Sequence, residues 1–331
     1  MSEIRWNPIL EEWVITATHR QDRTFFPPPD YNPLAPTKPG GFPTEIPAET
    51  YEIVVFENKF PSLRAEAGEP VVEGLPLSPV DLAQGVCEVV CYTPQPDAEL
   101  ATLPVSKVDQ LIAVWTDRFA ELGSREYVKY VYIFENKGRE IGVTLAHPHG
   151  QIYAYPFVPP TAQRELSSAK RHFERTGRDL FGDVLAAELE DGQRVVLENA
   201  HFVAVVPFFA RYPYEVQILP RAVRPTLLDF TEEERGALAE MLKGVLEKYN
   251  NLWNRSLPYI MVLHQAPTDG ENHDYYRFHI EFYPPYRTPD KLKYLAGSEA
   301  GAGVFINDTL AEVTAQTLRE TLPHSLTEIQ R

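Results

Sequence analysis

The sequence has few cysteines and little positive charge, and each shortage excludes classes of protein. Cys87 and Cys91 are the only cysteines in 331 residues, which excludes a disulfide framework and indicates a reducing, cytoplasmic location. Lysines and arginines number 31 against 47 aspartates and glutamates, so the formal net charge is −16. This charge opposes nucleic acid and anionic membranes as partners. A small anionic substrate would need a local cluster of cations.

Long apolar runs are absent as well. No stretch approaches the roughly 20 apolar residues that cross a bilayer, and residues 1–5 do not resemble a signal peptide. We therefore expect no membrane partner. A chain of this length can bury a sizeable core, and the length suggests two domains.

The apolar residues follow the same order of strand and helix patterns twice. Each round consists of two strand patterns, an amphipathic helix and a strand pair. The predicted elements are strands at 53–56 and 86–92, a helix at 106–122 and a strand pair within 130–155, then strands at 202–208 and 214–219, a helix from 231 and strands at 259–263 and 278–283. Ser106 with Asp109, and Thr231 with Glu234, are predicted to cap the two helices. This order predicts an α+β fold in which one unit, an antiparallel sheet with a helix, is duplicated. The charged, helical pattern at 159–191 is expected to link the two halves.

The most informative motif lies at the start of a predicted strand. Because strand side chains alternate, His147, His149 and Gln151 are expected to share one face. Pro148 lacks a backbone donor and so suggests a sheet edge, and Gly150 is expected to let a substrate approach the backbone. Two histidines packed at a strand end are the plain alternative. The preceding turn with Asn136 and Lys137 supplies a cation and favours a functional site.

These residues resemble a known family. The run Phe134-Glu135-Asn136-Lys137-Gly138, followed by His-Pro-His-Gly-Gln at 147–151, resembles galactose-1-phosphate uridylyltransferases of the histidine-triad superfamily. The match extends from residues 5–8 to 297–299. It implies two histidine-triad-like halves: 1–160 with the His-Pro-His motif, and 161–331 with a metal site and a loop that binds the sugar phosphate. It also implies a cytoplasmic homodimer with shared active sites, acting in galactose metabolism on UDP-glucose and galactose 1-phosphate.

His149 is the candidate nucleophile, because an imidazole nitrogen attacks phosphorus well and the phosphoramidate leaves well in a second attack. It must be neutral, with its other nitrogen donating to an acceptor such as a backbone carbonyl near His147. Gln151 could donate its amide to a phosphoryl oxygen. Hydrolases of the superfamily have a histidine near this place, which can act as an acid; glutamine cannot, and it therefore favours transfer over hydrolysis.

Further residues are assigned to substrate binding. Arg20 and Arg23 are surface charges by composition alone, but the resemblance assigns them to the nucleotide-sugar. Asn136, Lys137, Gly142 and Thr144 could hold phosphate oxygens. The resemblance assigns two more groups: Asn58, Phe60 and Val89 to a uridine pocket, and Lys293, Tyr294, Ser298 and Glu299 to a segment that reaches the partner's active site.

The resembling family has two metal sites, and this chain keeps a different share of the ligands of each. The first keeps only His147, because Asn32, Ala35 and Pro96 stand where the family has its other zinc ligands. We expect no zinc there, and a proline-rich loop at 25–49 held by packing. The second retains two histidines and two carboxylates, a set that suits zinc or ferrous iron, and we expect one structural divalent metal there. Its residues are Glu165, His264, His279 and Glu281, of which only Glu281 departs from the family pattern.

Three other functions remain open. A related phosphorylase that handles adenine nucleotides, such as an ADP-sugar phosphorylase, is the nearest alternative. A hydrolase is disfavoured by Gln151. A non-enzymatic nucleotide-binding protein is disfavoured by the intact His149.

Overall fold

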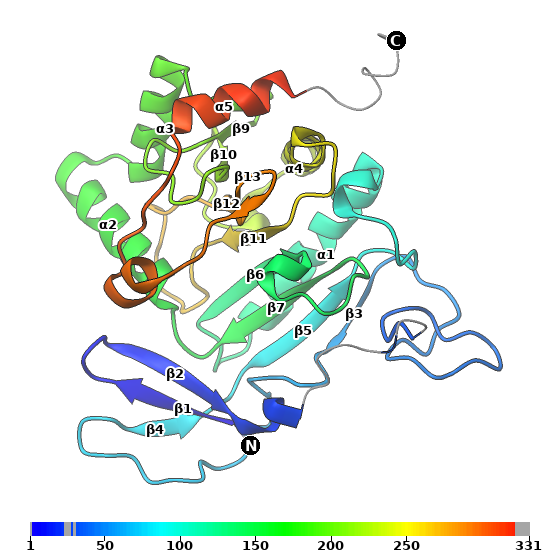
Figure 1. Ribbon diagram of the computed structural model, residues 1–331. Coiled ribbons are helices and arrows are strands. Elements are labelled where there is room, and N and C mark those ends of the chain that lie inside the picture. Colours follow the sequence, from blue (N-terminus) through cyan, green and yellow to red (C-terminus); the bar gives the residue numbers. More distant parts are fainter. Residues whose placement is uncertain (1, 23–27, 29–30, 322–331) are drawn as a thin grey trace.

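The computed structural model describes residues 2–22, 28 and 31–321. Its centre is a nine-stranded sheet in which every neighbouring pair runs antiparallel (Figure 1). In spatial order the strands are β3 (Val54–Glu57), β5 (Val86–Cys91), β7 (His149–Tyr155), β6 (Tyr130–Lys137), β11 (Tyr259–His264), β12 (His279–Tyr283), β10 (Val216–Pro220), β9 (Phe202–Val205) and β8 (Val195–Glu198).

The sheet contains two copies of one four-stranded unit, and β8 adds a ninth strand at the edge beside β9. The first has the order β3-β5-β7-β6, with helix α1 (Val105–Gly123) inserted between β5 and β6. The second has the order β9-β10-β12-β11, with helix α4 (Glu232–Leu252) inserted between β10 and β11. The units meet where β6 pairs with β11, with Phe134 opposite Val262. The predicted α+β fold with a duplicated unit is therefore confirmed.

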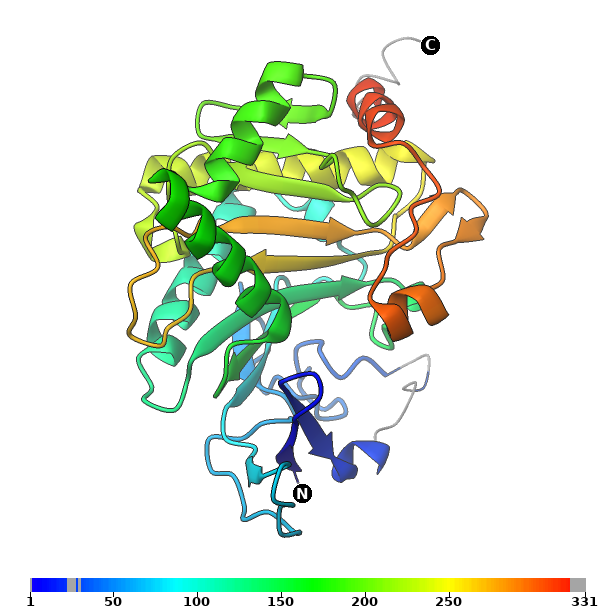
Figure 2. The ribbon, with the colours of Figure 1, turned by 90° about the vertical axis from the view of Figure 1, so that its left-hand side faces the viewer.

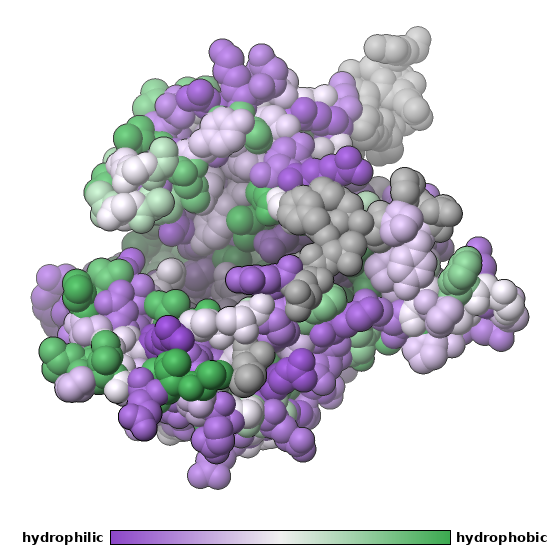
Figure 3. Space-filling model, turned by 60° about the horizontal axis from the view of Figure 1, so that its bottom comes forward, coloured by the Kyte–Doolittle hydropathy of each residue, from purple (hydrophilic) through white to green (hydrophobic). Residues whose placement is uncertain are grey.

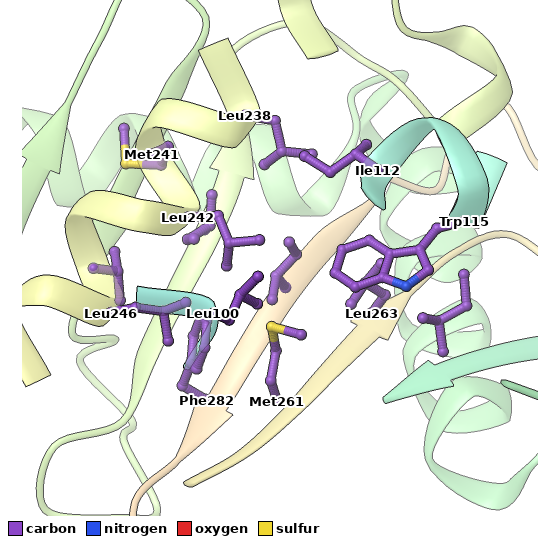
Figure 4. Close-up of a cluster of buried hydrophobic side chains, with 14 of the residues drawn as sticks. Leu100, Ile112, Trp115, Leu238, Met241, Leu242, Leu246, Met261, Leu263 and Phe282 are labelled. Atoms are coloured by element: carbon purple, nitrogen blue, oxygen red, sulfur yellow. The ribbon is translucent and has the colours of Figure 1, made fainter. Parts of the chain in front are cut away.

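The largest core lies between the sheet and the helix pair α1 and α4. Helical spacing of three and four residues gives each helix one apolar face, and the two faces meet over the strands. Figure 4 shows Leu238, Leu242 and Leu246 of α4 gathered with Ile112 and Trp115 of α1 over β11 and β12. Burying a leucine of this kind stabilises the fold by about 1.5–3 kcal/mol.

The two predicted helix caps had different outcomes. Thr231 Oγ1 accepts a hydrogen bond from Glu234 N at 3.2 Å, and Glu234 Oε2 accepts one from Thr231 N at 2.9 Å, so this capping box is confirmed. The cap at Ser106 was wrong, because α1 begins at Val105 with Pro104 in the N-cap position. Asp109 instead accepts from Arg235 Nε at 2.8 Å and ties α1 to α4.

Helices α2 (Pro160–Thr176) and α3 (Leu180–Asp191) occupy the segment expected to be a linker. They lie across the face of the sheet opposite α4 (Figure 2). Ala162, Leu166 and Ala169 are buried on one side of α2, at helical spacing. The linker is therefore helical, as its pattern indicated, and it also covers the C-terminal half of the sheet.

Smaller elements complete the molecule. A second sheet has the order β2 (Glu12–Ala17), β1 (Ser2–Asn7), β4 (Val80–Leu82), and β13 (Tyr286–Thr288) pairs with β14 (Lys291–Leu292). Helix α5 (Ala311–Glu320) ends the described chain. Figure 3 shows a face hollowed near its middle, with hydrophilic and hydrophobic residues interspersed. Among the described residues, no helix has the length and apolar character needed to cross a membrane.

Candidate active site

Two cavities meet at His149, the first residue of β7. The first, of about 260 Å³, is lined by Asn58, Phe60, Val89 and Gln151 among others. The second, of about 320 Å³, includes Asn136, Lys137 and the His-Pro-His segment. His149, Thr144 and Leu145 line both. The prediction of a sheet edge from Pro148 was wrong, because β7 lies between β5 and β6 and Pro148 precedes the strand.

The ring of His149 is held from one side. Its Nδ1 lies 2.7 Å from the backbone oxygen of His147. A carbonyl oxygen can only accept, so Nδ1 carries the proton and the lone pair of the neutral ring is on Nε2. The hydrogen bond predicted from the sequence is confirmed, and the lone pair on Nε2 is what the predicted role of His149 as a nucleophile requires.

Two donors fix the amide of Gln151. Its Oε1 accepts from Asn58 Nδ2 at 3.3 Å and lies 3.4 Å from the hydroxyl of Tyr153. Because both contacts fall on the oxygen, the amide NH₂ is turned the other way and can donate to a bound group. This orientation suits the predicted contact with a phosphoryl oxygen.

Packing inside the sheet explains why residue 150 is a glycine. A side chain built on it would place its Cβ 2.2 Å from the hydroxyl of Tyr92 and 3.1 Å from the backbone oxygen of Phe134. Glycine is therefore required by packing inside the sheet, where the Tyr92 hydroxyl donates to Glu135 at 3.3 Å. The approach of a substrate to this part of the backbone stays a prediction.

The cations near the cavities are partly engaged. Lys137 Nζ lies 2.8 Å from Glu99 Oε2 and 3.3 Å from Asn250 Oδ1. Arg20 donates from Nη1 to the backbone oxygen of Phe60 at 3.3 Å, beside the first cavity. Gly142 lines neither cavity; it ends a 3-10 turn with a φ of 85°, which glycine adopts readily. Arg23 lies outside the described residues.

The C-terminal segment assigned to sugar phosphate lies apart from these cavities. Among the described residues, neither cavity has a lining residue from this segment. Lys293 is buried, with its Nζ 3.2 Å from Glu299 Oε1, and the Ser298 hydroxyl donates to the backbone oxygen of Val304 at 2.7 Å. Tyr294 is 76% exposed. Within one chain, these four residues do not meet His149.

His147 is enclosed by neutral groups. Its Nε2 lies 2.8 Å from the backbone oxygen of Thr93 and 2.8 Å from the hydroxyl of Tyr51. Its Nδ1 lies 3.0 Å from Asn32 Nδ2. Burial lowers the pKa of His147, which keeps the ring neutral. Since both ring nitrogens are engaged, the residues present do not fit a zinc ion here.

A second cluster lies in the C-terminal half. Glu165 of α2, His264 at the end of β11 and His279 at the start of β12 bring ligand atoms within 4.8 Å of one another. The two imidazole rings stack at 4.7 Å, and His279 Nδ1 donates to the backbone oxygen of Arg277 at 3.0 Å. Burial lowers the pKa of His264, but the charges of Glu165 and Glu281 outweigh it and raise this pKa to about 9. The geometry fits a divalent metal held by one carboxylate and two imidazoles.

Glu281 lies beside this group but is engaged elsewhere. It accepts from Gln217 Nε2 at 2.7 Å, from Arg211 Nη2 at 2.9 Å and from the Tyr283 hydroxyl. Its oxygens lie 3.7 Å from Nε2 of both histidines. The structure therefore brings three of the four predicted ligands into one compact group, with Glu281 as their neighbour.

Comparison with known proteins decides the family. The family description "Galactose-1-phosphate uridyl transferase, N-terminal domain" matches residues 1–159, and its C-terminal counterpart matches residues 165–330. The chain belongs to the galactose-1-phosphate uridylyltransferase family. A relative of that name from Thermotoga maritima is 40% identical over 324 residues, covering 97% of this chain and 99% of that protein. One from Rattus norvegicus is 34% identical, covering 96% and 86%.

A solved structure of a uridylyltransferase has the same fold. It is titled "Structure of uridylyltransferase", has a TM-score of 0.86 and 32% identity, and covers 99% of this chain and 100% of that chain. The resemblance inferred from the residues at 134–151 is confirmed, and with it the prediction of a transferase.

Several residues of this uridylyltransferase site were missed from the sequence. Tyr153 follows Gln151 by two positions on one strand, so alternation could have identified it. Tyr51 reaches His147 from a distant segment and gave no local signal, whereas Asn32 had been placed near His147 only through the family's metal site, with no role as a hydrogen-bond partner. Arg139 lines the second cavity and lies two residues after Lys137 in the sequence.

Proposed function

We propose that this family member exchanges a uridylyl group between UDP-glucose and galactose 1-phosphate, in galactose metabolism, through a covalent uridylyl-His149. The observation that carries the proposal is the ring of His149. Its Nδ1 proton is fixed on the His147 carbonyl, and it stands where two cavities meet. One cavity would take the nucleoside and the other the departing or arriving sugar phosphate.

The reaction proceeds by two displacements. In the first, Nε2 of His149 attacks the α-phosphorus of UDP-glucose; the N–P bond forms, and the P–O bond to glucose 1-phosphate breaks. In the second, a phosphate oxygen of galactose 1-phosphate attacks the same phosphorus, and the N–P bond breaks to give UDP-galactose. The ring becomes positively charged as it bonds to phosphorus, and the hydrogen bond from Nδ1 to a carbonyl oxygen stabilises that charge.

Neighbouring groups bind and orient the substrates. Phe60 and Val89 offer apolar surface for the uracil ring, and Asn58 offers a polar edge. Gln151 donates its amide to a phosphoryl oxygen. Arg20, Arg23, Asn136, Lys137, Gly142 and Thr144 hold phosphate oxygens, through side chains or backbone, so that positioning and charge neutralisation supply most of the rate.

The assembly and the metal complete the proposal. We infer a cytoplasmic homodimer in which Lys293, Tyr294, Ser298 and Glu299 of one subunit reach the other subunit's active site; the exposure of Tyr294 supports this. One structural zinc or iron ion is held by Glu165, His264 and His279, with Glu281 beside them. No step of the reaction depends on this ion.

Exchange of labelled glucose 1-phosphate into UDP-glucose tests the function directly. We expect exchange without galactose 1-phosphate, because the first displacement is reversible and needs no acceptor. The protein should gain the mass of UMP on His149; gain of AMP from an ADP-sugar would instead identify the adenine-specific phosphorylase. Absence of exchange, with intact UDP-glucose binding, would favour a non-enzymatic protein. Rapid loss of the isolated adduct in water would favour a hydrolase.

A further inference from the structure

The hydrogen bonds around His147 fix which of its ring nitrogens carries the proton. Asn32 Oδ1 accepts from Leu34 N at 3.0 Å, which turns the Asn32 NH₂ group toward His147 Nδ1. Nδ1 therefore accepts, and Nε2 carries the proton and donates to the backbone oxygen of Thr93. The hydroxyl of Tyr51 has one proton, which the Thr93 oxygen at 2.7 Å and the Leu34 oxygen at 3.2 Å can accept, and its oxygen lies 2.8 Å from Nε2 of His147, where it can accept the Nε2 proton. Each polar atom of the ring has a partner of the right kind.

This arrangement joins two distant parts of the chain. Asn32 and Tyr51 belong to the proline-rich loop and the segment after it, which contain no strand or helix within residues 31–53. Leu34 and Ile46 of the loop pack with Val89 and Cys91 of β5. The loop was expected to be held by packing, and these apolar contacts are present. The hydrogen bonds that Asn32 and Tyr51 make with His147 add a fixed geometry, because hydrogen bonds are directional and apolar contacts are not.

The tie reaches the nucleophile through the backbone. The ring of His147 is fixed from three sides, and the next residue, Pro148, accepts from Tyr92 N at 3.3 Å through its carbonyl oxygen. The carbonyl of His147 then accepts the Nδ1 proton of His149. Because the His147 ring is joined to its backbone through Cβ, holding the ring on three sides restrains the position of residue 147 and so of the carbonyl that orients the His149 imidazole.

We propose that Tyr51 and Asn32 are positioning residues for His149, acting through His147 as a hydrogen-bonded replacement for a metal tie at this position. The proposal rests on the function proposed above and adds two residues to it. The partners that orient a reactive or ligating histidine typically change activity by about 10- to 100-fold when they are removed. We expect the same range here, in the rate of the first displacement.

The experiment measures the single-turnover rate of His149 uridylylation by UDP-glucose, in full-length protein, at a series of UDP-glucose concentrations. Tyr51→Phe removes only the hydroxyl, and Asn32→Asp replaces the donor by an acceptor of the same shape. Thr37→Val is the matched control, because Thr37 donates to the Ile46 oxygen at 2.8 Å within the same loop and does not contact His147. Both test variants should lose about 10-fold or more in the maximal rate, with half-saturating UDP-glucose within about two-fold of wild type. The control should keep the wild-type rate.

A second measurement reports on the ring itself. Nitrogen-15 NMR of the imidazoles should show the Nε2–H tautomer for His147 in wild type and a changed state in Asn32→Asp. An Nδ1–H tautomer in wild type would overturn the proposal, even if a variant failed to fold. Test variants that react as fast as Thr37→Val, or that lose only thermal stability, would overturn it too. Failure of the proposed function is distinct, since wild type would then form no adduct at all.

Discussion

Two histidines occupy the same position in the two halves of this uridylyltransferase. His149 begins β7 and His279 begins β12, the matching strands of the duplicated unit. Each ring donates from Nδ1 to the backbone oxygen two residues earlier, at 2.7 Å and 3.0 Å. The likeness continues along the strand, because an acceptor follows at the third residue and a tyrosine at the fifth. These pairs are Gln151 with Tyr153 and Glu281 with Tyr283, and in both the tyrosine hydroxyl donates to the acceptor.

The halves differ in what covers this shared arrangement. His149 lines two cavities, whereas His279 is only 2% exposed, with Phe181 of α3 against its ring at 4.9 Å. Helix α2 adds Glu165, and β11 adds His264. Under the proposed function, the same oriented imidazole would act as a nucleophile where it lines two cavities, and as a metal ligand where helices α2 and α3 cover it. In this proposal the helices that cover His279, more than the local motif, separate the metal-binding role from the nucleophilic role.

Removal of His149, the histidine that lines the two cavities, should give the largest loss of activity. His149→Ala should lower glucose 1-phosphate exchange by at least about 10⁴-fold, because no other group can take the uridylyl. The assay is exchange of labelled glucose 1-phosphate into UDP-glucose. His279→Ala is the matched change in the C-terminal half and should retain most of the exchange. Comparable losses in both variants would remove the distinction drawn here.

Substitution of Gln151, the acceptor two residues after His149, should give the next largest loss of activity. Gln151→Ala should slow both half-reactions by about 100- to 1,000-fold, the typical cost of losing one oxyanion donor. UDP-glucose binding should be largely unchanged. Gln151→His should also raise the release of free UMP without acceptor, since imidazole can deliver a proton to the leaving group. Wild-type transfer by Gln151→Ala would leave Gln151 without a catalytic role.

Metal removal should lower the thermal stability of the C-terminal half and leave the exchange activity at His149 largely unchanged. Metal analysis should give about one ion per chain, and His279→Ala should lose it. A ligand present at about 100 times its dissociation constant stabilises a fold by about 2.7 kcal/mol, so the thermal midpoint should fall while exchange persists. Calorimetry of chelated and metal-loaded protein checks this. Two tightly bound equivalents, one of them at His147, would contradict the assignment.

An effect on stability alone concerns two buried carboxyls, one in each half. Burial raises the pKa of Glu135 and of Glu215 to about 7. Between the unfolded value of 4.5 and about 7, the native protein binds more protons than the unfolded chain, so stability should fall as pH rises through this window. Glu135→Gln removes one of these groups, and it should flatten that fall by up to about 3 kcal/mol between pH 4.5 and pH 8. Urea unfolding across this range measures it, and an unchanged slope would contradict the assignment to Glu135.

The parts of the fold that follow local patterns were predictable. The buried faces of α1 and α4 and the strand pairs in both halves depend on spacing along the chain, which the sequence displays directly. The cap at Ser106 failed because α1 already begins at Val105, with Pro104 in the N-cap position. Its fixed φ suits the helix entry.

The site was predictable only where the motif itself lies. His149 and Gln151 follow from strand alternation, and the orientation of His149 follows from imidazole chemistry. The reason for Gly150 is the hydroxyl of Tyr92, and the orientation of His147 comes from Asn32 and Tyr51, all distant in the chain. Contacts of this kind depend on tertiary packing, so no pattern along the strand could reveal them.

The junction of β6 and β11 has a consequence for the speed of folding. Phe134 and Val262 face each other across it, yet they are about 130 residues apart in the sequence, and such distant pairings slow folding. Each half can first form its own strand pair, β6 with β7 and β11 with β12, from nearer segments. Until the halves join, β6 and β11 are open edges to which another chain could add. Refolding yield should therefore drop as protein concentration rises.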